Sequence, residues 1–160
     1  RNEVKTYYKS ENEFQNSLNL EIEYFVNNSV HVKRASQMSM KTNQFNLTAK
    51  RYSISDISLF MKNHKVITVC VSDKYGDMGV VGLAILIDNE IDTFLMSCRA
   101  FGRKIENTIF SICEKETPSG KMFASYIPTF KNALVEKFFD GRGMQIYDND
   151  GRIAKYVKET

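Results

Sequence analysis

The sequence predicts a mixed α/β domain, in which a mixed β-sheet carries helices on its faces. Two runs dense in β-branched residues, 65–72 and 80–87, flank a glycine-bearing turn, as in a β-hairpin. An amphipathic helix is predicted over 102–116, where apolar residues recur every three or four positions. Further strands are predicted at 91–98 and 122–127, so strands and helices alternate along the chain.

The first third of the chain is more polar. Residues 1–18 are expected to form a lead-in or linker with one or two turns of helix, and residues 19–160 are expected to form the domain itself. Alternating apolar residues predict a half-buried strand over 20–25, and a helical spacing follows at 30–40. An amide-rich loop comes next, and Ser55-Asp56 is expected to cap a second helix.

The remaining elements follow from periodicity and from turn residues. The strands of the hairpin are apolar on both faces, so both faces of the sheet are expected to be covered. The 102–116 helix is expected to end at Pro118-Ser119-Gly120. Another helix is predicted over 132–140, and two short strands over 145–147 and 152–157.

Composition excludes several classes of protein. The 160 residues suit one domain, and 42% hydrophobic with 26% charged residues is typical of a globular chain. The net charge of +3 is evenly spread, which disfavours nucleic acid. The longest apolar stretch, Gly79–Ile87, is too short to span a membrane. The start at Arg1 suggests a piece of a longer protein.

Metal and disulfide chemistry are also disfavoured. Cys70, Cys98 and Cys113 form no C-x-x-C pair and lie in apolar runs, which predicts three buried thiols and a reducing, cytoplasmic location. His31 and His64 have no partner at metal-ligand spacing, so both are expected at the surface or in helix caps. No metal site is predicted.

The most informative junction runs from the strand at 91–98 through Arg99–Lys104 into the predicted helix. A helix start offers free backbone N–H groups and the positive end of its dipole, and Gly102 allows an anion to approach. Arg99, Arg103 and Lys104 add positive charge. The alternative is a tight turn with its cations in solvent.

Together with a second segment downstream, this junction resembles the GNAT acyltransferase superfamily. Arg99 and Gly102 match the signature Q/R-x-x-G-x-G/A. The second signature, N-x-x-A-x-x-x-Y-x-x-x-G-F, is matched in spacing by Asn132, Val135, Phe139, Gly143 and Met144. The resemblance implies an acetyl-CoA or acyl-CoA cofactor, or a phosphopantetheine thioester. The residues implied to bind it are Arg99, Gly102, Arg103, Lys104, Asn132 and Phe139.

Two residues depart from the GNAT pattern. Lys104 stands where a small residue belongs, so it either adds a charge contact or blocks the approach to the pyrophosphate. Phe139 stands where many GNAT enzymes have a tyrosine that protonates the leaving thiolate. A phenyl ring donates no proton, so that step would need another group or water.

Four strings narrow the resemblance to FkbH-like proteins of the HAD superfamily. They are TNQFNLT-x-KRY at 42–52, DKYGD-x-G at 73–79, IDTFL-x-SCR at 91–99 and YIPT-x-KN at 126–132. The resemblance implies an N-terminal HAD-superfamily domain in the full-length protein, and loading of a glyceryl unit onto an acyl carrier protein in polysaccharide or polyketide-type biosynthesis. The HAD nucleophile string D-x-D-x-T is absent, and Asp148–Gly151 predicts only a turn.

Other candidates have two interpretations each. Asp92 is either a catalytic base or a residue that caps or faces an edge. Ser97 and Cys98 end the strand near the expected thioester, but Cys98 lacks a visible base, which favours direct transfer. The amide-rich loop, with Asn43, Gln44, Phe45 and Asn46, either binds substrate or satisfies its own backbone.

Two functions therefore remain. The first is an acyltransferase-type domain in which the splayed sheet edge presents the thioester and an acceptor near 43–46 attacks it. The second is a non-catalytic module that docks a carrier protein for an absent HAD-superfamily domain, because a carrier's acidic surface suits the cations at Arg99–Lys104.

Overall fold

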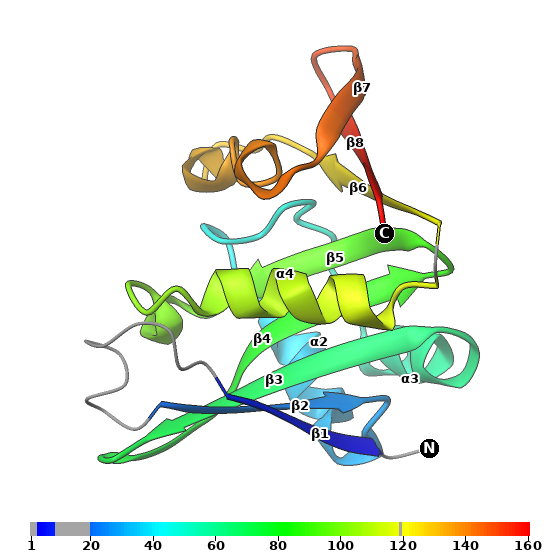
Figure 1. Ribbon diagram of the computed structural model, residues 1–160. Helices are drawn as coiled ribbons and strands as arrows, with labels where there is room; N and C mark the ends of the chain where they lie inside the picture. The colour runs from blue at the N-terminus through cyan, green and yellow to red at the C-terminus, as the bar shows by residue number, and fades with distance from the viewer. Residues whose placement is uncertain (1–2, 9–19, 119) are drawn as a thin grey trace.

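The computed structural model describes residues 3–8, 20–118 and 120–160 (Figure 1). In chain order the elements are β1 (Glu3–Tyr8), β2 (Glu21–Val26), the 3₁₀ turn η1 (Ser29–His31), α2 (Val32–Lys41), α3 (Ile54–Asn63), β3 (Lys65–Asp73), β4 (Gly76–Ile87), β5 (Glu90–Met96), the 3₁₀ turn η2 (Cys98–Ala100), α4 (Ile105–Glu116), β6 (Lys121–Tyr126), the 3₁₀ turns η3 (Ala133–Val135) and η4 (Asp140–Arg142), β7 (Gln145–Asn149) and β8 (Ala154–Glu159).

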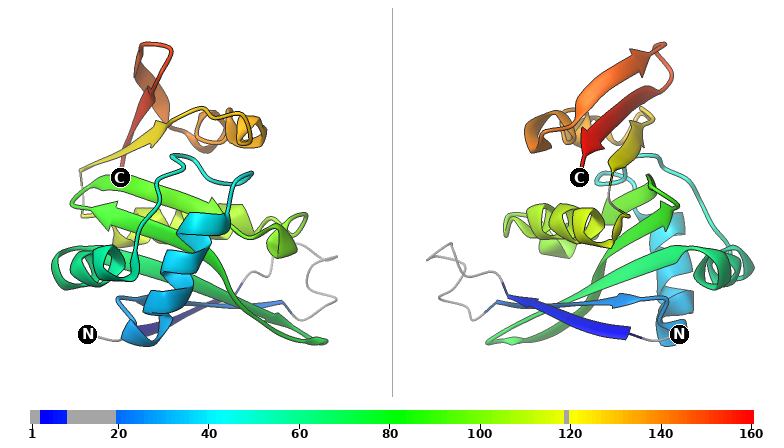
Figure 2. Two further views of the ribbon diagram at one scale, coloured as in Figure 1. Left: turned by 180° about the vertical axis from the view of Figure 1, so that it is seen from behind. Right: turned by 45° about the vertical axis from the view of Figure 1, so that its right-hand side comes forward.

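The eight strands form one mixed sheet in the order β1-β2-β3-β4-β5-β6-β8-β7. Every neighbouring pair is antiparallel except β5 and β6, which are parallel. Helix α4 lies on one face of the sheet, and α2 and α3 lie on the other (Figures 1 and 2). The predicted fold class, a mixed α/β sheet with helices on both faces, is therefore confirmed.

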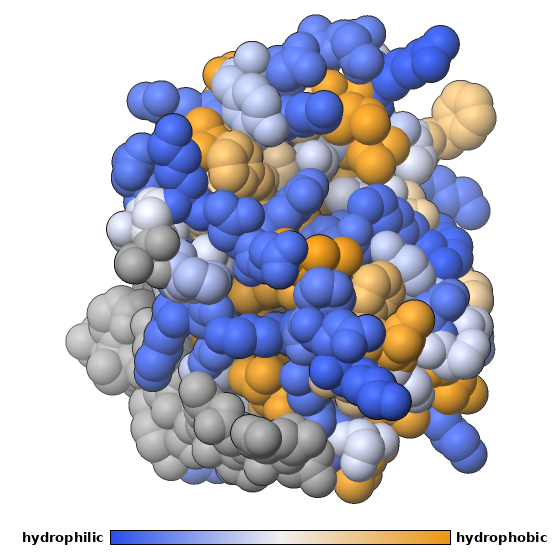
Figure 3. All heavy atoms as spheres, turned by 90° about the vertical axis from the view of Figure 1, so that its right-hand side faces the viewer, coloured by the Kyte–Doolittle hydropathy of each residue, from blue (hydrophilic) through white to orange (hydrophobic). Residues whose placement is uncertain are grey.

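Both faces of the sheet are buried because its central strands are apolar on both sides. One core packs α4 against the sheet, with Ile105, Ile109 and Ile112 facing inward. The other core packs α2 and α3 against the opposite face, through Met38 and Ile57. On the side of the molecule shown in Figure 3, hydrophobic residues form small groups among hydrophilic ones.

The Ile109 side chain of α4 packs directly on Gly82 of β4, because Gly82 has no side chain. A Cβ at Gly82 would lie 2.5 Å from Ile109 Cδ1 and 3.3 Å from Val69 Cβ. Glycine here lets the helix pack directly on the strand backbone.

The predicted helical lead-in is wrong for residues 3–8, which form β1 and pair with β2 in antiparallel register from Glu3↔Val26 to Tyr8↔Glu21. This run holds Val, Thr and Tyr, which favour strands, and β2 would otherwise leave its outer edge unpaired. The rest of the lead-in lies outside the described residues.

The predicted 132–140 helix is also wrong. The segment forms η3 and a turn that leads into η4, because the backbone bonds Val135 N→Asn132 O, Phe138 N→Val135 O and Arg142 N→Phe139 O each span three residues. A 3₁₀ turn has three residues per turn, so Val135 and Phe138 both face the core. Helix α4 begins at Ile105, three residues later than predicted.

Smaller shifts have local causes. Helix α3 is capped by Ser53 in a capping box with Asp56, rather than by Ser55. The predicted 91–98 strand ends at Met96, because Ser97 caps η2 by accepting a bond from Arg99 N. The turns predicted at 73–77 and around Asp150 are confirmed.

Candidate functional site

Strands β5 and β6 pair only at one end and then diverge. Their register holds at Glu90↔Phe123 and Ile91↔Ala124. Residues Phe45–Leu47, the inserted segment, lie in the opening beyond (Figure 1). Leu47 N donates to Phe94 O at 3.0 Å, and Met96 N donates to Phe45 O at 3.0 Å.

The inserted segment also bonds to the β6 side of the opening. Ile127 N donates to Leu47 O at 2.8 Å, and the Asn132 amide donates to Asn46 O at 2.8 Å. Part of the splayed edge of β5 is therefore already paired. This corrects the expectation that the edge itself presents the thioester, because Phe94 O and Met96 N are used by the chain's own backbone.

Side chains of the 48–52 stretch fasten the inserted segment to the rest of the fold. Asp92 accepts bonds from Lys50 Nζ at 2.7 Å and from the Tyr52 hydroxyl at 2.6 Å. Arg51 donates to Ser39 O, in the last turn of α2, and to Thr42 O, just after the helix ends. Burial and the Asp92 carboxylate raise the pKa of Tyr52. Both oxygens of the buried Asp92 carboxylate are therefore bonded by this stretch.

On the β6 side of the opening, the Asn132 side chain holds the inserted segment by hydrogen bonds. Its side chain is fully buried, donates to Asn46 O and Ile127 O, and accepts from Thr129 N and from the Tyr126 hydroxyl. All the hydrogen-bonding capacity of the amide is used within the protein. Asn132, predicted to bind the cofactor, instead holds the inserted segment in place.

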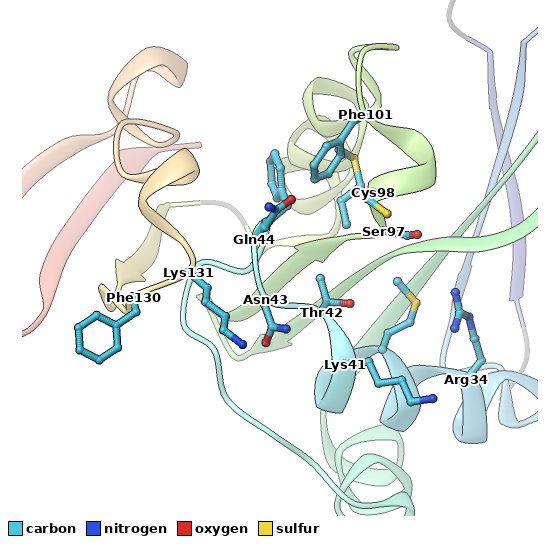
Figure 4. A pocket seen from close by; sticks show the side chains of 13 residues that line it. Arg34, Lys41, Thr42, Asn43, Gln44, Ser97, Cys98, Phe101, Phe130 and Lys131 are labelled. Carbon is cyan, nitrogen blue, oxygen red and sulfur yellow. The ribbon is translucent and has the colours of Figure 1, made fainter.

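A cavity of about 660 Å³ opens between α2, the 42–45 loop and the end of β5; we call it the α2-side cavity (Figure 4). It is lined by Arg34, Met38, Lys41, Thr42, Asn43, Gln44, Phe45, Met96, Ser97, Cys98, Phe101, Phe130 and Lys131. Arg34 and Lys41 of α2 lie on the same side of the cavity, opposite Ser97 and Cys98 (Figure 4).

A second cavity of about 430 Å³, the α4-side cavity, lies between the start of α4 and the η3–η4 segment. It is lined by Phe45, Met96, Phe101, Gly102, Glu106, Leu134, Val135, Lys137, Phe138 and Arg142. The two cavities share Phe45, Met96 and Phe101, so they meet at the end of the inserted segment. The Phe45 ring packs against Phe94, Phe101 and Phe138 there.

Two buried polar atoms in the α4-side cavity lack a hydrogen-bond partner in the described part of the chain. They are Glu106 Oε1 and Arg142 Nε. The rest of the Arg142 guanidinium stacks on Phe138 and donates to Phe138 O. Burial lowers the pKa of Arg142, and the nearby Glu106 carboxylate acts in the opposite direction. Both atoms are buried, and the two charged side chains that carry them lie in the wall of this cavity.

The predicted anion-binding turn before α4 has the backbone of a tight turn. Gly102 has φ +83°, and Lys104 has φ +59° as the N-cap of α4. Arg103 is paired with Asp73 Oδ2 at 2.8 Å, which lowers the pKa of that carboxyl. Gly102 lines the α4-side cavity, whereas Arg99, Arg103 and Lys104 line neither cavity.

Phe139 also lines neither cavity. Its ring is 1% exposed and packs among Phe94, Phe110, Phe138 and Tyr156. Phe138, its neighbour, faces the α4-side cavity instead. The missing tyrosine hydroxyl at position 139 would therefore have no access to a ligand in either cavity.

The other predicted residues divide in the same way. Asn43, Gln44, Phe45, Ser97 and Cys98 line the α2-side cavity, whereas Asn46 is buried and bonded to the loop backbone. The expectation of three buried thiols is wrong for Cys98, which is exposed, and for Cys70, which is half-buried. Burial raises the pKa of Cys70 to about 11 and also raises that of Cys113.

Sequence reasoning missed the cations of the α2-side cavity. Arg34, Met38 and Lys41 are spaced by four and three residues on α2, which places them on one helix face. This spacing was the available signal. Lys131 comes from the loop after β6, and only the tertiary structure brings it to the same cavity.

Within the described ranges, no cluster of three or more histidine, cysteine, aspartate or glutamate side chains has the arrangement of a metal site. None of the helices in these ranges combines the length and apolar character that crossing a membrane requires.

No family model matches the chain, and no curated protein sequence matches it significantly. Solved structures do match. YncA from Salmonella typhimurium, assigned as an acetyltransferase and solved with acetyl-CoA, aligns with TM-score 0.59 at 10% identity over 86% of this chain and 93% of its own. A GNAT-family acetyltransferase from Streptococcus pneumoniae aligns with TM-score 0.56 at 10% identity over 88% and 99%.

A third match is the acetyltransferase from Salmonella typhimurium that modifies the N-terminal serine of ribosomal protein L7/L12, with TM-score 0.56 at 9% identity over 87% and 95%. At such low sequence identity, these structural similarities establish the fold alone. The chain has the fold of the GNAT acetyltransferases, as its two signatures predict.

Proposed function

We propose that this chain is an acyltransferase-type domain that takes an acyl group from a thioester, either acyl-CoA or a carrier-protein phosphopantetheine. The observation that carries the proposal is the meeting of the two cavities at Phe45, Met96 and Phe101. A GNAT-like fold with one cavity on each side of the splayed strand has room for a donor on one side and an acceptor on the other.

The α4-side cavity fits the donor. Its walls are largely apolar, and Glu106, Lys137 and Arg142 are the charged residues among them. A pantetheine arm is an uncharged, flexible aliphatic chain that contains amides, and such a chain suits a lining of this composition. Gly102, where an added Cβ would meet no atom within 4 Å, leaves space for a larger group at the start of α4.

The proposed reaction is direct transfer. The acceptor's nitrogen or oxygen attacks the thioester carbonyl, a new C–N or C–O bond forms, and the C–S bond breaks. The thiolate leaves and the acceptor's proton ends on it or in water. Because Phe139 is buried and has no acidic proton, this chain supplies no acid at that position.

We further propose that the domain belongs to an FkbH-like protein with an N-terminal HAD-superfamily domain, active in the cytoplasm. Support comes from the strings that carry the resemblance. The string TNQFNLT-x-KRY contains the inserted segment and the side chains that hold it in place. The string IDTFL-x-SCR contains the strand with which that segment pairs, and YIPT-x-KN contains Asn132. Three of the four strings thus meet in one place.

Calorimetric titration of CoA, acetyl-CoA and phosphopantetheinylated carrier protein tests the donor site. Gly102→Asp places a negative charge in the α4-side cavity, and we expect it to weaken CoA binding about tenfold. Gly79→Asp is the matched control, because Gly79 also has a positive φ, also has open space and lines neither cavity.

Equal loss in both variants, or CoA binding no tighter than free phosphate, would contradict a donor in this cavity. Thiol release from acetyl-CoA, or from an acylated carrier, then tests transfer itself. CoA binding without thiol release in the presence of amine, alcohol and carrier acceptors would favour the second function below.

The second candidate is a non-catalytic module that docks a carrier protein. Phe130 is fully exposed and points away from the α2-side cavity (Figure 4), and Leu134 is 65% exposed nearby in the chain. Lys131 and Lys137 add charge to the same segment. An apolar and cationic surface suits an acidic partner. Charge reversal at Lys131, which does not line the α4-side cavity, would weaken carrier binding but not CoA binding.

A further inference from the structure

The charged side chains that line the α2-side cavity are all cationic. Arg34, Lys41 and Lys131 contribute three cationic side chains, and no carboxylate is among the described residues that line it. Arg99 lies close enough for its charge to act on Arg34. Protein surfaces usually intersperse both signs, so a concave surface with one sign is typical of sites that attract an oppositely charged ligand.

The cations are not neutralised elsewhere in the described part of the chain. Arg34 donates to neutral oxygens, Gln37 Oε1 at 2.7 Å and Val80 O at 3.3 Å. Lys41 and Lys131 have no ion-pair partner there. Burial and the neighbouring Arg99 lower the pKa of Arg34, so a bound anion would relieve an unfavourable arrangement.

The uncharged lining residues add donors. Arg51 donates to Asn43 Oδ1 at 2.7 Å, which leaves the Asn43 amide nitrogen free to donate to a ligand. Ser97 Oγ accepts from Arg99 N at 3.3 Å, so its own proton remains available. In Figure 4 the side chains of Arg34, Lys41, Thr42, Ser97 and Cys98 surround one open space.

We infer that the α2-side cavity binds the acceptor of the transfer and that this acceptor carries an oxyanion, a carboxylate or a phosphate, held by Arg34 and Lys41, while Lys131 adds positive charge elsewhere in the lining. The direction of transfer rests on the proposed function, but anion binding does not require it. The anion would lie on the α2 side of the junction at Met96, and the acceptor's nucleophile would face the thioester on the other side.

Inorganic phosphate, acetate and glycerol are the probes, titrated separately into the protein without CoA and followed by calorimetry and NMR. We expect phosphate to bind more tightly than acetate if the anion is a phosphate, the reverse if it is a carboxylate, and glycerol not to bind. Binding should weaken as salt is raised.

Arg34→Gln and Lys41→Gln should each weaken anion binding about tenfold, because each removes a charged hydrogen-bond donor. Lys33→Gln is the matched control: it removes the same charge from the adjacent position of α2, is exposed and lines neither cavity. Lys41 is exposed, so its replacement preserves the fold even if Arg34→Gln does not.

Equal effects of Lys33→Gln and Lys41→Gln would overturn the proposal, since binding would then follow net charge alone. Failure of both anions to bind would also overturn it while leaving the donor site intact. Displacement of the bound anion by CoA would show that this cavity holds the donor's phosphates, which overturns its assignment to the acceptor. Absence of CoA binding with anion binding retained would contradict only the proposed function.

Discussion

The two cavities share a wall but differ in chemistry. The α2-side cavity is lined by three cations and by uncharged polar groups, whereas the α4-side cavity has mostly apolar walls and places Glu106 among its cations. Their common boundary is the aromatic cluster at Phe45. A neutral flexible chain suits the second cavity and an anion the first, so one sheet edge separates two kinds of ligand.

The boundary between the cavities depends most on Asn132. Asn132→Ala would leave Asn46 O, Ile127 O, Thr129 N and the Tyr126 hydroxyl without this partner. We expect a loss of about 3 kcal/mol in unfolding free energy, equivalent to a melting temperature lower by roughly 6–12 °C. Thermal unfolding followed by circular dichroism measures it.

Asn43→Ala is the control, because it removes an amide that accepts only one side-chain bond at the surface. It should shift the melting temperature by less than about 3 °C. Similar shifts for the two variants would mean that the inserted segment is not held by Asn132.

Phe139→Tyr tests whether the Phe139 ring belongs to the hydrophobic core or to the candidate functional site. Because Phe139 is 1% exposed, a hydroxyl there would be buried, and we expect a loss of about 1–3 kcal/mol with no gain in thiol release. Phe123→Tyr makes the same change at a half-buried ring and should be nearly neutral. A rise in turnover at unchanged stability would contradict the buried position of Phe139.

Glu106→Gln should make the two cavities more alike in charge, because it removes the carboxylate from the α4-side cavity. Removing the carboxylate from the α4-side cavity should strengthen the binding of anionic CoA about threefold, while binding of inorganic phosphate in the α2-side cavity stays unchanged. Calorimetry measures both. Glu90→Gln, at the exposed start of β5, is the control. An equal gain from both variants would indicate a general charge effect.

The smallest effect is expected from Asp73→Asn, which removes the partner of Arg103. The pKa of Asp73 is lower in the folded protein than its ordinary value, so its ionised form stabilises the fold above about pH 4. The stability difference between wild type and variant should vanish as the pH falls through the folded pKa. Urea unfolding across this range, with Asp77→Asn as control, measures the difference. No difference at neutral pH, or a difference that persists in acid, would mean that the ionised pair does not stabilise the fold.

Sequence reasoning predicted most elements because their causes are local. The β-branched runs predicted β3 and β4, and the turn residues between them predicted the hairpin. It failed where a distant partner decides. Residues Glu3–Tyr8 became a strand because β2 offers an edge. The 132–140 segment formed η3 and a turn into η4 where Asn132, at its start, is held by Asn46 and Ile127.

The candidate site divides in the same way. The amide-rich loop and the turn before α4 were predicted as site residues, and Asn43, Gln44, Phe45 and Gly102 do line the cavities. Asn46 was predicted from the same amide-rich loop, and Asn132 was implied by the second GNAT signature. Yet the Asn132 amide bonds to the backbone of Asn46, 86 residues away, and the Asn46 amide bonds to its local loop. A string of residues identifies a segment but does not show which of its amides remain free.

The sequence by itself determined the mixed sheet and the GNAT-like signatures, because patterning and composition are properties of the chain alone. Only the tertiary structure decided that residues 45–47 fill part of the opening between β5 and β6. It alone brought Arg34, Lys41 and Lys131 around one cavity. Such groupings depend on packing between distant segments, which local patterns do not encode.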